Sequence, residues 1–470
     1  MAVTILVVGL LVFFGHFLAG FFERTKVPDV LVLMLAGILL GPVFHVVEPA
    51  DFGKVGPVFT TLALIIILFE GGIHLNVRAL GSAATDTLLI SLATLALTLL
   101  LLSLLADLLL PLDFASAMFV GAVLAGTSSA VIVPLIKVLK PNPGPATVLF
   151  LESAATDVLV IVLALGLLQG LIAEAGGAGL ATGSGGSIAL QVGGSFLVAG
   201  LVGAGGAFVW SAILDKVRQL PNTVFTTLAY VFILFGLTEL WGYSGAIAAL
   251  TFGVAVANLP NIPDRLFGRV FTFRLAAFAE HERAFFGEAV FLVKTFFFVY
   301  LGVSVSFSDW WAVTAGLILA AAAFAARTPV VRLLASPKTT SRRDAALLTV
   351  LVPKGLAAAV MASLPLQAGL PGGELIQGTV YATVFFSIVA CAFLVFLVER
   401  GTIDPVLRLW LSKFPEQIEP AETAAPAPPA PGSPTFTDVS LGLPAPVADL
   451  HEPNPITDLD APDSREPEAP

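Results

Sequence analysis

The feature that most constrains this chain is a succession of long apolar runs separated by short polar links. A run of about 20 apolar residues crosses the hydrocarbon core of a bilayer as one helix, which satisfies its own backbone hydrogen bonds there. The runs predict about thirteen such spans. Only 12% of the 470 residues are charged, about half the share usual in soluble domains. We therefore expect an all-α polytopic membrane protein.

The net charge of −10 belongs to the end of the chain and not to the apolar part. From Phe414 onward the sequence holds eleven acidic residues and one basic residue, Arg465, among many Pro and Ala residues. A segment with so few apolar residues cannot bury a core. We therefore expect a transmembrane domain over 1–413 and a disordered acidic tail over 414–470. The single cysteine, Cys391, excludes an internal disulfide framework and a multi-thiolate metal site.

The basic residues predict the orientation of the spans. If the N-terminus lies outside, the pairs Arg24 and Lys26, Lys137 and Lys140, and Lys216 and Arg218 all fall on the cytoplasmic side, as the positive-inside rule demands. The tail then lies in the cytoplasm as well. This pattern favours an integral protein of a prokaryotic inner (plasma) membrane.

Two spans contain residues that interrupt a helix at mid-depth. The span over 114–138 contains Gly126-Thr127-Ser128-Ser129 followed by Pro134, and the span over 345–366 contains Pro353-Lys354-Gly355. Pro removes a helical hydrogen bond and Gly weakens the helix. The two spans are separated by an odd offset, which reverses their orientation in the membrane. The pattern predicts an inverted repeat with two crossed broken helices, which in transporters surround a midplane binding site.

Two carboxylates, Glu152 and Asp157, lie deep in the span over 146–173. A carboxylate at this depth costs several kcal/mol unless it is paired or hydrated. On a helix the two side chains point about 140° apart, so they serve different partners. We interpret Asp157 as a site for H+ and for Na+ or K+, and Glu152 as a structural residue.

Hydroxyl groups gather near Asp157 and at the first break. Thr127, Ser128 and Ser129 can replace part of the water shell of a cation, because hard cations prefer oxygen ligands. Thr156 and Ser153 belong to the same candidate site. The alternative interpretation is that the three break hydroxyls only satisfy backbone groups within the helix.

Three basic residues also lie within apolar spans: Arg327, Lys294 and Lys354. A buried guanidinium needs a carboxylate, and we expect a structural Glu152–Arg327 pair, with direct ion handling as the alternative. Lys294 either neutralises a carboxylate when the ion is absent or holds two helices together. Lys354, at the second break, is expected to offset the partial charges of broken helix ends.

With these residues in view, the sequence resembles the monovalent cation/proton antiporter superfamily, closest to its sodium/proton and potassium/proton exchangers. The likeness covers about residues 1–400 and rests on the order and spacing of several short motifs. These motifs are Val27-Pro28-Asp29 through Leu40-Gly41-Pro42, Phe69-Glu70-Gly71-Gly72, Glu152-Ser153 with Asp157, Lys294-Thr295-Phe296-Phe297-Phe298-Val299-Tyr300-Leu301-Gly302, and Pro353-Lys354-Gly355-Leu356.

The resemblance implies a homodimer in which a core domain, about 87–173 and 285–398, moves against a dimerisation domain, about 3–75 and 189–258. It implies that Asp157 binds H+ and the cation in turn, and that the Glu152–Arg327 pair looks like the structural pair of the Asn-Asp branch. The chain departs from that branch at Thr156, where the branch has Asn. It also departs at Thr127-Ser128-Ser129, which is closer to the potassium efflux relatives.

The expected function is therefore exchange of H+ for a monovalent cation, Na+ being favoured and K+ possible, by alternating access. One titrating acid, Asp157, predicts one H+ per cation and no net charge moved, whereas proton release by Lys294 as well would produce a current. The alternatives on the same fold are a cation channel and a sodium-coupled symporter of an organic anion. An intramembrane enzyme is excluded because Ser128 and Ser153 lack a nearby histidine base and only one aspartate lies deep. No cofactor or nucleic acid is expected, and the bilayer is the surrounding partner.

Overall fold

The computed structural model describes residues 9–10, 13–17, 28–48, 55–74, 85–175, 185–219, 225–258, 280–305, 309–402 and 409–416. Within these ranges the chain is helical and contains no strand, which confirms the predicted all-α class. Among the described residues, seven helices are long and apolar enough to cross a membrane by length and composition. The count of about thirteen spans stays a prediction, because most of the first span, 3–22, lies outside the described residues. The acidic tail beyond residue 416 also lies outside the described residues.

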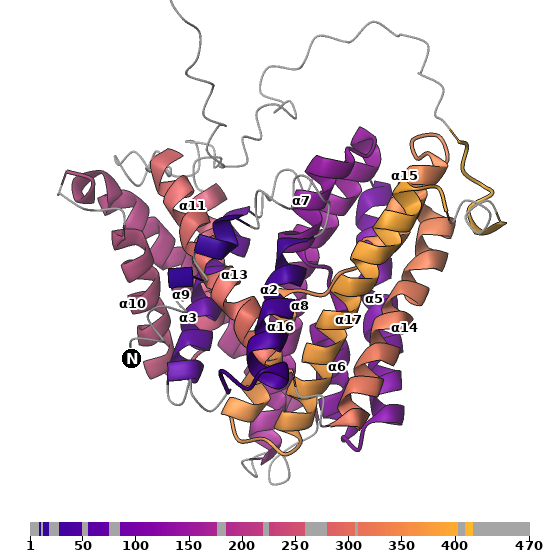
Figure 1. Cartoon of the computed structure of the whole chain (residues 1–470). Coiled ribbons are helices and arrows are strands. Elements are labelled where there is room, and N and C mark those ends of the chain that lie inside the picture. Colours follow the sequence, from indigo (N-terminus) through magenta and orange to yellow (C-terminus); the bar gives the residue numbers. More distant parts are fainter. Residues whose placement is uncertain are drawn as a thin grey trace, which may run out of the picture. The chain divides into compact units, whose positions relative to one another are not determined.

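The first half of the chain forms a run of helices that ends in the span carrying Asp157 (Figure 1). Pro42, which cannot donate a helical hydrogen bond, lies in a short π-helical turn that continues the first of them. The elements are α2 (Asp29–Ile38), η1 (Leu39–Val43), α3 (Val55–His74), α5 (Thr85–Leu109), α6 (Phe114–Ala125), α7 (Ser129–Leu139) and α8 (Pro143–Ala175).

The second half repeats this pattern of long helices around one broken span. Its elements are α9 (Gly185–Val217), α10 (Thr226–Leu240), α11 (Gly245–Asn258), α13 (Glu280–Ser304), α14 (Trp310–Leu334), α15 (Arg342–Val350), α16 (Leu356–Gln367) and α17 (Gly373–Glu399). The breaks at 126–128, between α6 and α7, and at 351–355, between α15 and α16, lie where the sequence predicts them.

Polar side chains fix where several helices begin. Asp113 accepts a hydrogen bond from the backbone N–H of Ser116 (3.1 Å) at the start of α6, and Asp309 accepts two at the start of α14. Ser341 accepts one from Asp344 (3.2 Å) at the start of α15. These side chains satisfy N–H groups that a first helical turn leaves without partners.

The helices pack as two groups that can be followed in Figure 1. One group contains both broken spans together with α5, α8, α14 and α17. The other contains α2, α3, α9, α10, α11 and α13. Helix α13, which the sequence analysis groups with the core, makes its most extensive packing with α2 and also contacts η1.

Two close helix crossings lie at positions that the predicted repeat makes equivalent. A Cβ atom at Gly37 or Gly302, where α2 crosses α13, would lie 2.2 Å from a carbonyl oxygen of the partner helix. At Gly72 and Gly253, where α3 crosses α11, the corresponding distances are 2.5 and 2.4 Å. The predicted repeat relates α2 to α11 and α3 to α13, so these crossings are equivalent. Only Gly permits such close backbone contact.

Candidate functional site

The two broken spans meet at their breaks. The backbone N–H of Ser128, in the first break, donates a hydrogen bond to the carbonyl of Pro353 in the second (2.9 Å). A Cβ atom at Gly355 would lie 2.0 Å from the hydroxyl of Ser128. Residue 355 must therefore be Gly for the two chain segments to cross. Four half-helix ends and their backbone groups converge at this point.

Asp157, on α8, lies beside the first break. Its Oδ2 atom accepts hydrogen bonds from the hydroxyl of Ser129 (2.5 Å) and from the backbone N–H of Ser129 (3.2 Å). Ser129 is the first residue of α7, so the carboxylate faces the positive end of a half-helix dipole. Asp157 as a residue is partly buried within the bundle. Glu70, on α3, lies near enough for the two carboxylates to repel each other.

Thr127 and Thr156 join the break to α8 at the residue just before Asp157. The backbone N–H of Thr127 donates to the hydroxyl of Thr156 (3.2 Å), and the two hydroxyl oxygens lie 3.4 Å apart. Both side chains are buried. Ser153 is buried too, but its hydroxyl donates to the carbonyl of Phe150 within the same helix (3.1 Å). The structure therefore brings Thr127, Thr156 and Ser129 to the break and leaves Ser153 bonded to its own helix.

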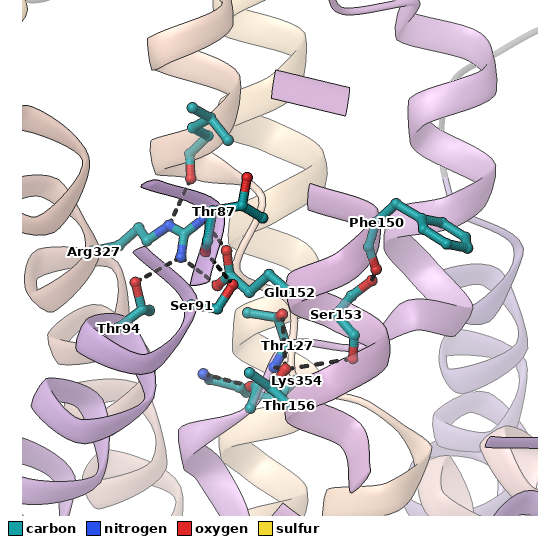
Figure 2. A network of polar contacts seen from close by, with 12 residues as sticks. Thr87, Ser91, Thr94, Thr127, Phe150, Glu152, Ser153, Thr156, Arg327 and Lys354 are labelled. Carbon is teal, nitrogen blue, oxygen red and sulfur yellow. Dashed lines mark hydrogen bonds and ion pairs between the residues drawn. The ribbon is translucent and has the colours of Figure 1, made fainter. Parts of the chain in front are cut away.

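Glu152 and Arg327 form a buried two-pronged ion pair, shown in Figure 2. The Nη2 atom of Arg327 lies 2.7 Å from Oε2 of Glu152, while Nη1 contacts Oε1. The same guanidinium donates to the hydroxyl of Thr94 on α5 and to the carbonyl of Leu348 on α15, both at 2.8 Å. Both charged side chains are essentially inaccessible to solvent. The pair thus ties α5, α8, α14 and α15 together around a single arginine.

Lys354 bonds to the opposite break. Its ammonium group donates to the carbonyl of Gly126 (2.9 Å), the residue that ends α6. Its backbone N–H donates to the hydroxyl of Ser387 on α17 (2.9 Å). The ammonium charge therefore lies at the negative end of the half-helix α6, next to the crossing.

Lys294 pairs with Asp29, which could not be predicted as its partner from the sequence. Its ammonium lies 2.8 Å from Oδ2 of Asp29, at the start of α2, and both side chains are largely buried. The pair joins α2 to α13, and among the described residues Lys294 forms no hydrogen bond or ion pair with Asp157. Of the two roles left open for Lys294, the observed contact corresponds to the one that holds two helices together.

Sequence reasoning also missed several polar residues that hold the breaks and their flanks. Asp344, near the start of α15, accepts a hydrogen bond from the side chain of Asn142 at the start of α8 (2.6 Å). Ser387 supports the second break from α17. A lone Ser or Thr within an apolar helix gives no signal in the sequence, because most such residues bond to their own backbone. Asp29 and Asp344 stand at helix starts, where acids are common for reasons of capping alone.

Within the described ranges, no cluster of three or more His, Cys, Asp or Glu side chains has an arrangement that could hold a metal ion. The hydroxyl bonded to the Asp157 carboxylate is that of Ser129, and a second carboxylate, that of Glu70, lies near enough to interact with it.

Known proteins resemble this chain in sequence and in fold. The family described as "Sodium/hydrogen exchanger, transmembrane" matches residues 9–400. The Na(+)/H(+) antiporter 1 of Methanocaldococcus jannaschii is 29% identical over 161 residues, which are 33% of this chain and 37% of that protein. The K(+)/H(+) antiporter NhaP2 of Shewanella sp. (strain MR-4) is 23% identical over 406 residues, which are 82% of this chain and 63% of the relative. The chain thus spans less than two thirds of either relative.

A solved structure has the same fold. The sodium proton antiporter MjNhaP1 from Methanocaldococcus jannaschii, determined at pH 8, superimposes with a TM-score of 0.61 and 22% sequence identity. The match covers 83% of this chain and 99% of that one. The family match extends over most of the chain and includes both broken spans and α8. The chain is therefore a transmembrane member of the sodium/hydrogen exchanger family.

Proposed function

We propose that this protein exchanges H+ for a monovalent cation, Na+ being favoured and K+ the alternative, with Asp157 binding the two in turn. The observation that carries the proposal is the position of the Asp157 carboxylate, beside the crossing and bonded to Ser129 at the start of a half-helix. A carboxylate in this place can hold either a proton or a cation, but not both at once. Competition for one group is the simplest coupling between two ions.

The groups around Asp157 support cation binding. The deprotonated carboxylate supplies one negative charge, and the hydroxyls of Ser129, Thr127 and Thr156 lie on the two segments that flank it. Backbone carbonyls released at the break add further oxygen atoms. When a proton replaces the cation, the Ser129 hydroxyl can turn from donating to the carboxylate to accepting from it, because a hydroxyl does both.

Charge accounting supports electroneutral exchange. The charges of Glu152 and Arg327 cancel within their own pair, and Lys294 is paired with Asp29. Lys354 is held by the carbonyl of Gly126. In this proposal Lys354 keeps its proton throughout and Asp157 takes up and releases one, so one H+ moves for each monovalent cation.

The two groups of helices supply the movement that alternating access needs. In this proposal the group with the broken spans moves as a core against the group of α2, α3, α9, α10, α11 and α13, and two copies of the chain join through the latter. The protein lies in the plasma membrane, with its N-terminus outside the cell and its tail in the cytoplasm. A site that faces both sides in turn drives exchange only if each ion binds one state better than it binds the other.

The deciding experiment uses purified protein in sealed liposomes with an internal pH dye. A pH gradient is imposed, and Na+, K+ or Li+ is added to wild type, to Asp157→Asn and to Asp107→Asn, which changes an exposed acid on α5. We expect cation-dependent loss of the gradient in wild type and in Asp107→Asn, and none in Asp157→Asn.

Equal loss of the gradient in all three proteins would remove Asp157 from the central role. Cation movement without proton movement would instead indicate a channel or a symporter on the same fold.

A further inference from the structure

A short segment near the end of the described chain packs against the last turn of α14. Leu411 and Phe414, in this segment of residues 409–416, are each only 1% exposed. The ammonium group of Lys413 donates to the carbonyl of Arg332 in α14 (3.1 Å). Two buried apolar side chains and a cation at a helix C-terminus, where positive charge is favoured, thus hold the segment in place.

The same helix end exposes apolar side chains. Leu333, in the last turn of the apolar helix Trp310–Leu334, is 75% exposed, and Leu409 and Trp410 of the segment are 74% and 53% exposed. We call these three side chains the apolar rim. Exposed apolar side chains at the end of a membrane span face lipid, and Trp favours the level of the headgroups. The rim therefore lies where this span meets the headgroup layer.

Three exposed cations accompany the apolar rim: Arg332, Lys338 and Lys413. Arg332 precedes Leu333 in α14, and Lys338 lies in the turn that follows the helix. None of the three forms an ion pair with an acid in the part of the chain that the structure describes. Glu416, the acid at the end of the segment, pairs instead with Arg342 (2.9 Å). The positive charge at this helix end is therefore open to an anion from outside the protein.

The two ends of α14 differ in charge. At its start, Asp309 caps the helix, and Asp309 and Glu374 line one cavity. Trp310, beside Asp309, is 75% exposed. Each end thus carries an exposed Trp, but an anion is attracted to the end with Arg332 and Lys338 and repelled by the end with the two acids.

We propose that the apolar rim, with the exposed cations Arg332 and Lys338, binds an anionic phospholipid. The guanidinium and ammonium groups contact the phosphate of the headgroup, to which Arg offers two parallel N–H donors. The acyl chains lie against Leu333 and Trp410. Because α14 belongs to the group with the broken spans, the bound lipid ties that group to one leaflet. This binding does not depend on the ion that the protein carries, and its test needs no transport.

Quenching of Trp410 fluorescence by brominated lipids tests the proposal in the full-length chain. Four changes, Trp210→Phe, Trp241→Phe, Trp310→Phe and Trp311→Phe, leave Trp410 as the only tryptophan. The protein is reconstituted in bilayers that contain either brominated phosphatidylglycerol or brominated phosphatidylcholine at the same mole fraction. We expect the anionic lipid to be favoured about tenfold at Trp410, because cations at the headgroup level attract it.

A second chain, which keeps Trp310 and replaces the other four tryptophans by Phe, is the control for the opposite end of the same helix. It should show no preference for the anionic lipid, because the acids Asp309 and Glu374 lie there. Equal preferences at Trp410 and Trp310, or none at Trp410, would overturn the proposal.

Two double variants of the Trp410 chain separate a lipid site from general surface charge. Arg332→Gln with Lys338→Gln should bring the preference close to one; the segment stays attached, because Lys413 bonds to the backbone of residue 332 and not to its side chain. Lys137→Gln with Lys140→Gln removes the same charge from the end of α7, a helix that packs on α8, and should leave the preference unchanged. Equal losses in the two variants would contradict a site at the rim. Loss of the preference on addition of inorganic phosphate would contradict it as well, because the site would then take a free anion and not a lipid.

Discussion

The Arg327 guanidinium joins four helices of the broken-span group, α5, α8, α14 and α15. Its contacts reach Glu152, Thr94 and Leu348 with almost no access to solvent. Losing either charge of a buried pair leaves the other without compensation, whereas losing both removes that penalty. The structural role of the pair can therefore be separated from a direct role in ion handling.

We predict that Arg327→Gln lowers the free energy of unfolding by about 3–5 kcal/mol, the cost of an uncompensated buried charge. Adding Glu152→Gln to the same protein should recover a large part of that loss. Thermal unfolding of the two single variants and the double variant in detergent measures the coupling. If the losses of the single variants simply add in the double variant, the two side chains do not act as a pair.

The sequence allowed much of this to be predicted at the scale of residues, because a buried guanidinium must find a carboxylate and few are available. Ser129 and Thr127 could also be identified as candidate site residues, because they lie at a predicted break. The pairing of Asp29 with Lys294 could not be predicted, because nothing in the sequence tells which two helices pack against each other. The role of Ser387 could not be predicted either, because its hydrogen bond to Lys354 depends on the path of the second break.

At the scale of elements, two neighbouring glycines of α3 differ in what surrounds them: Gly72 packs against α11, whereas Gly71 faces open space. A Cβ atom at Gly72 would lie 2.5 Å from a carbonyl of α11, whereas one at Gly71 would meet nothing within 4 Å. We predict that Gly72→Ala lowers the free energy of unfolding by about 1–3 kcal/mol, because the helices must separate. Gly71→Ala should be neutral or stabilising by up to about 1 kcal/mol. Thermal unfolding of both variants makes the comparison, and equal effects would contradict the crossing.

A second prediction at this scale concerns the start of α6. Partial burial acts to raise the pKa of Asp113, but hydrogen bonds from Ser116 outweigh it, and the pKa lies below its ordinary value of 3.8. A carboxyl with a lowered pKa stabilises the folded state at high pH, and that contribution is lost as the pH falls through the folded-state pKa. Asp113→Ala should therefore cost about 1 kcal/mol at neutral pH.

This cost should shrink as the solution is acidified below about pH 4, where the wild-type carboxylate becomes protonated as well. Melting temperatures of wild type and Asp113→Ala between neutral and acidic pH supply the test. A difference in melting temperature between the two proteins that stays constant over this range would show that the charge of Asp113 does not contribute to stability. Asp113→Asn serves as the control, because Asn caps a helix at every pH.

The breaks could be predicted from the sequence because Gly and Pro interrupt helices by known chemistry. That they cross, with Ser128 bonded to Pro353, follows from the repeat only in outline. The membership of α13 could not be predicted at all. Its apolar residues suit either group of helices, and the close contact at Gly37 and Gly302 is decided by the three-dimensional path of α2.

At the scale of the whole molecule, the ion pairs Glu152–Arg327 and Lys294–Asp29, seen among the described residues, predict electroneutral exchange if Asp157 carries the proton. The protein reconstituted in liposomes should transport at the same rate with and without an imposed membrane potential. One H+ and one monovalent cation carry equal charge in opposite directions, so the exchange moves no net charge. The measurement records Na+-driven proton movement while a K+ gradient and valinomycin set the potential. A rate that follows the potential, and that ceases to follow it in Lys294→Met, would show that Lys294 releases its proton during transport.

The equivalent glycine crossings of α2 with α13 and of α3 with α11 bear on how such a chain arose. If the predicted inverted repeat arose by gene duplication, the ancestral product was a polypeptide of about half this length that paired with an inverted copy of itself. One glycine-lined crossing then served both copies, and fusion into one chain freed each half to change alone. Lys294 and Asp29, which have no counterparts at the α3–α11 crossing, mark a place where the halves have since diverged.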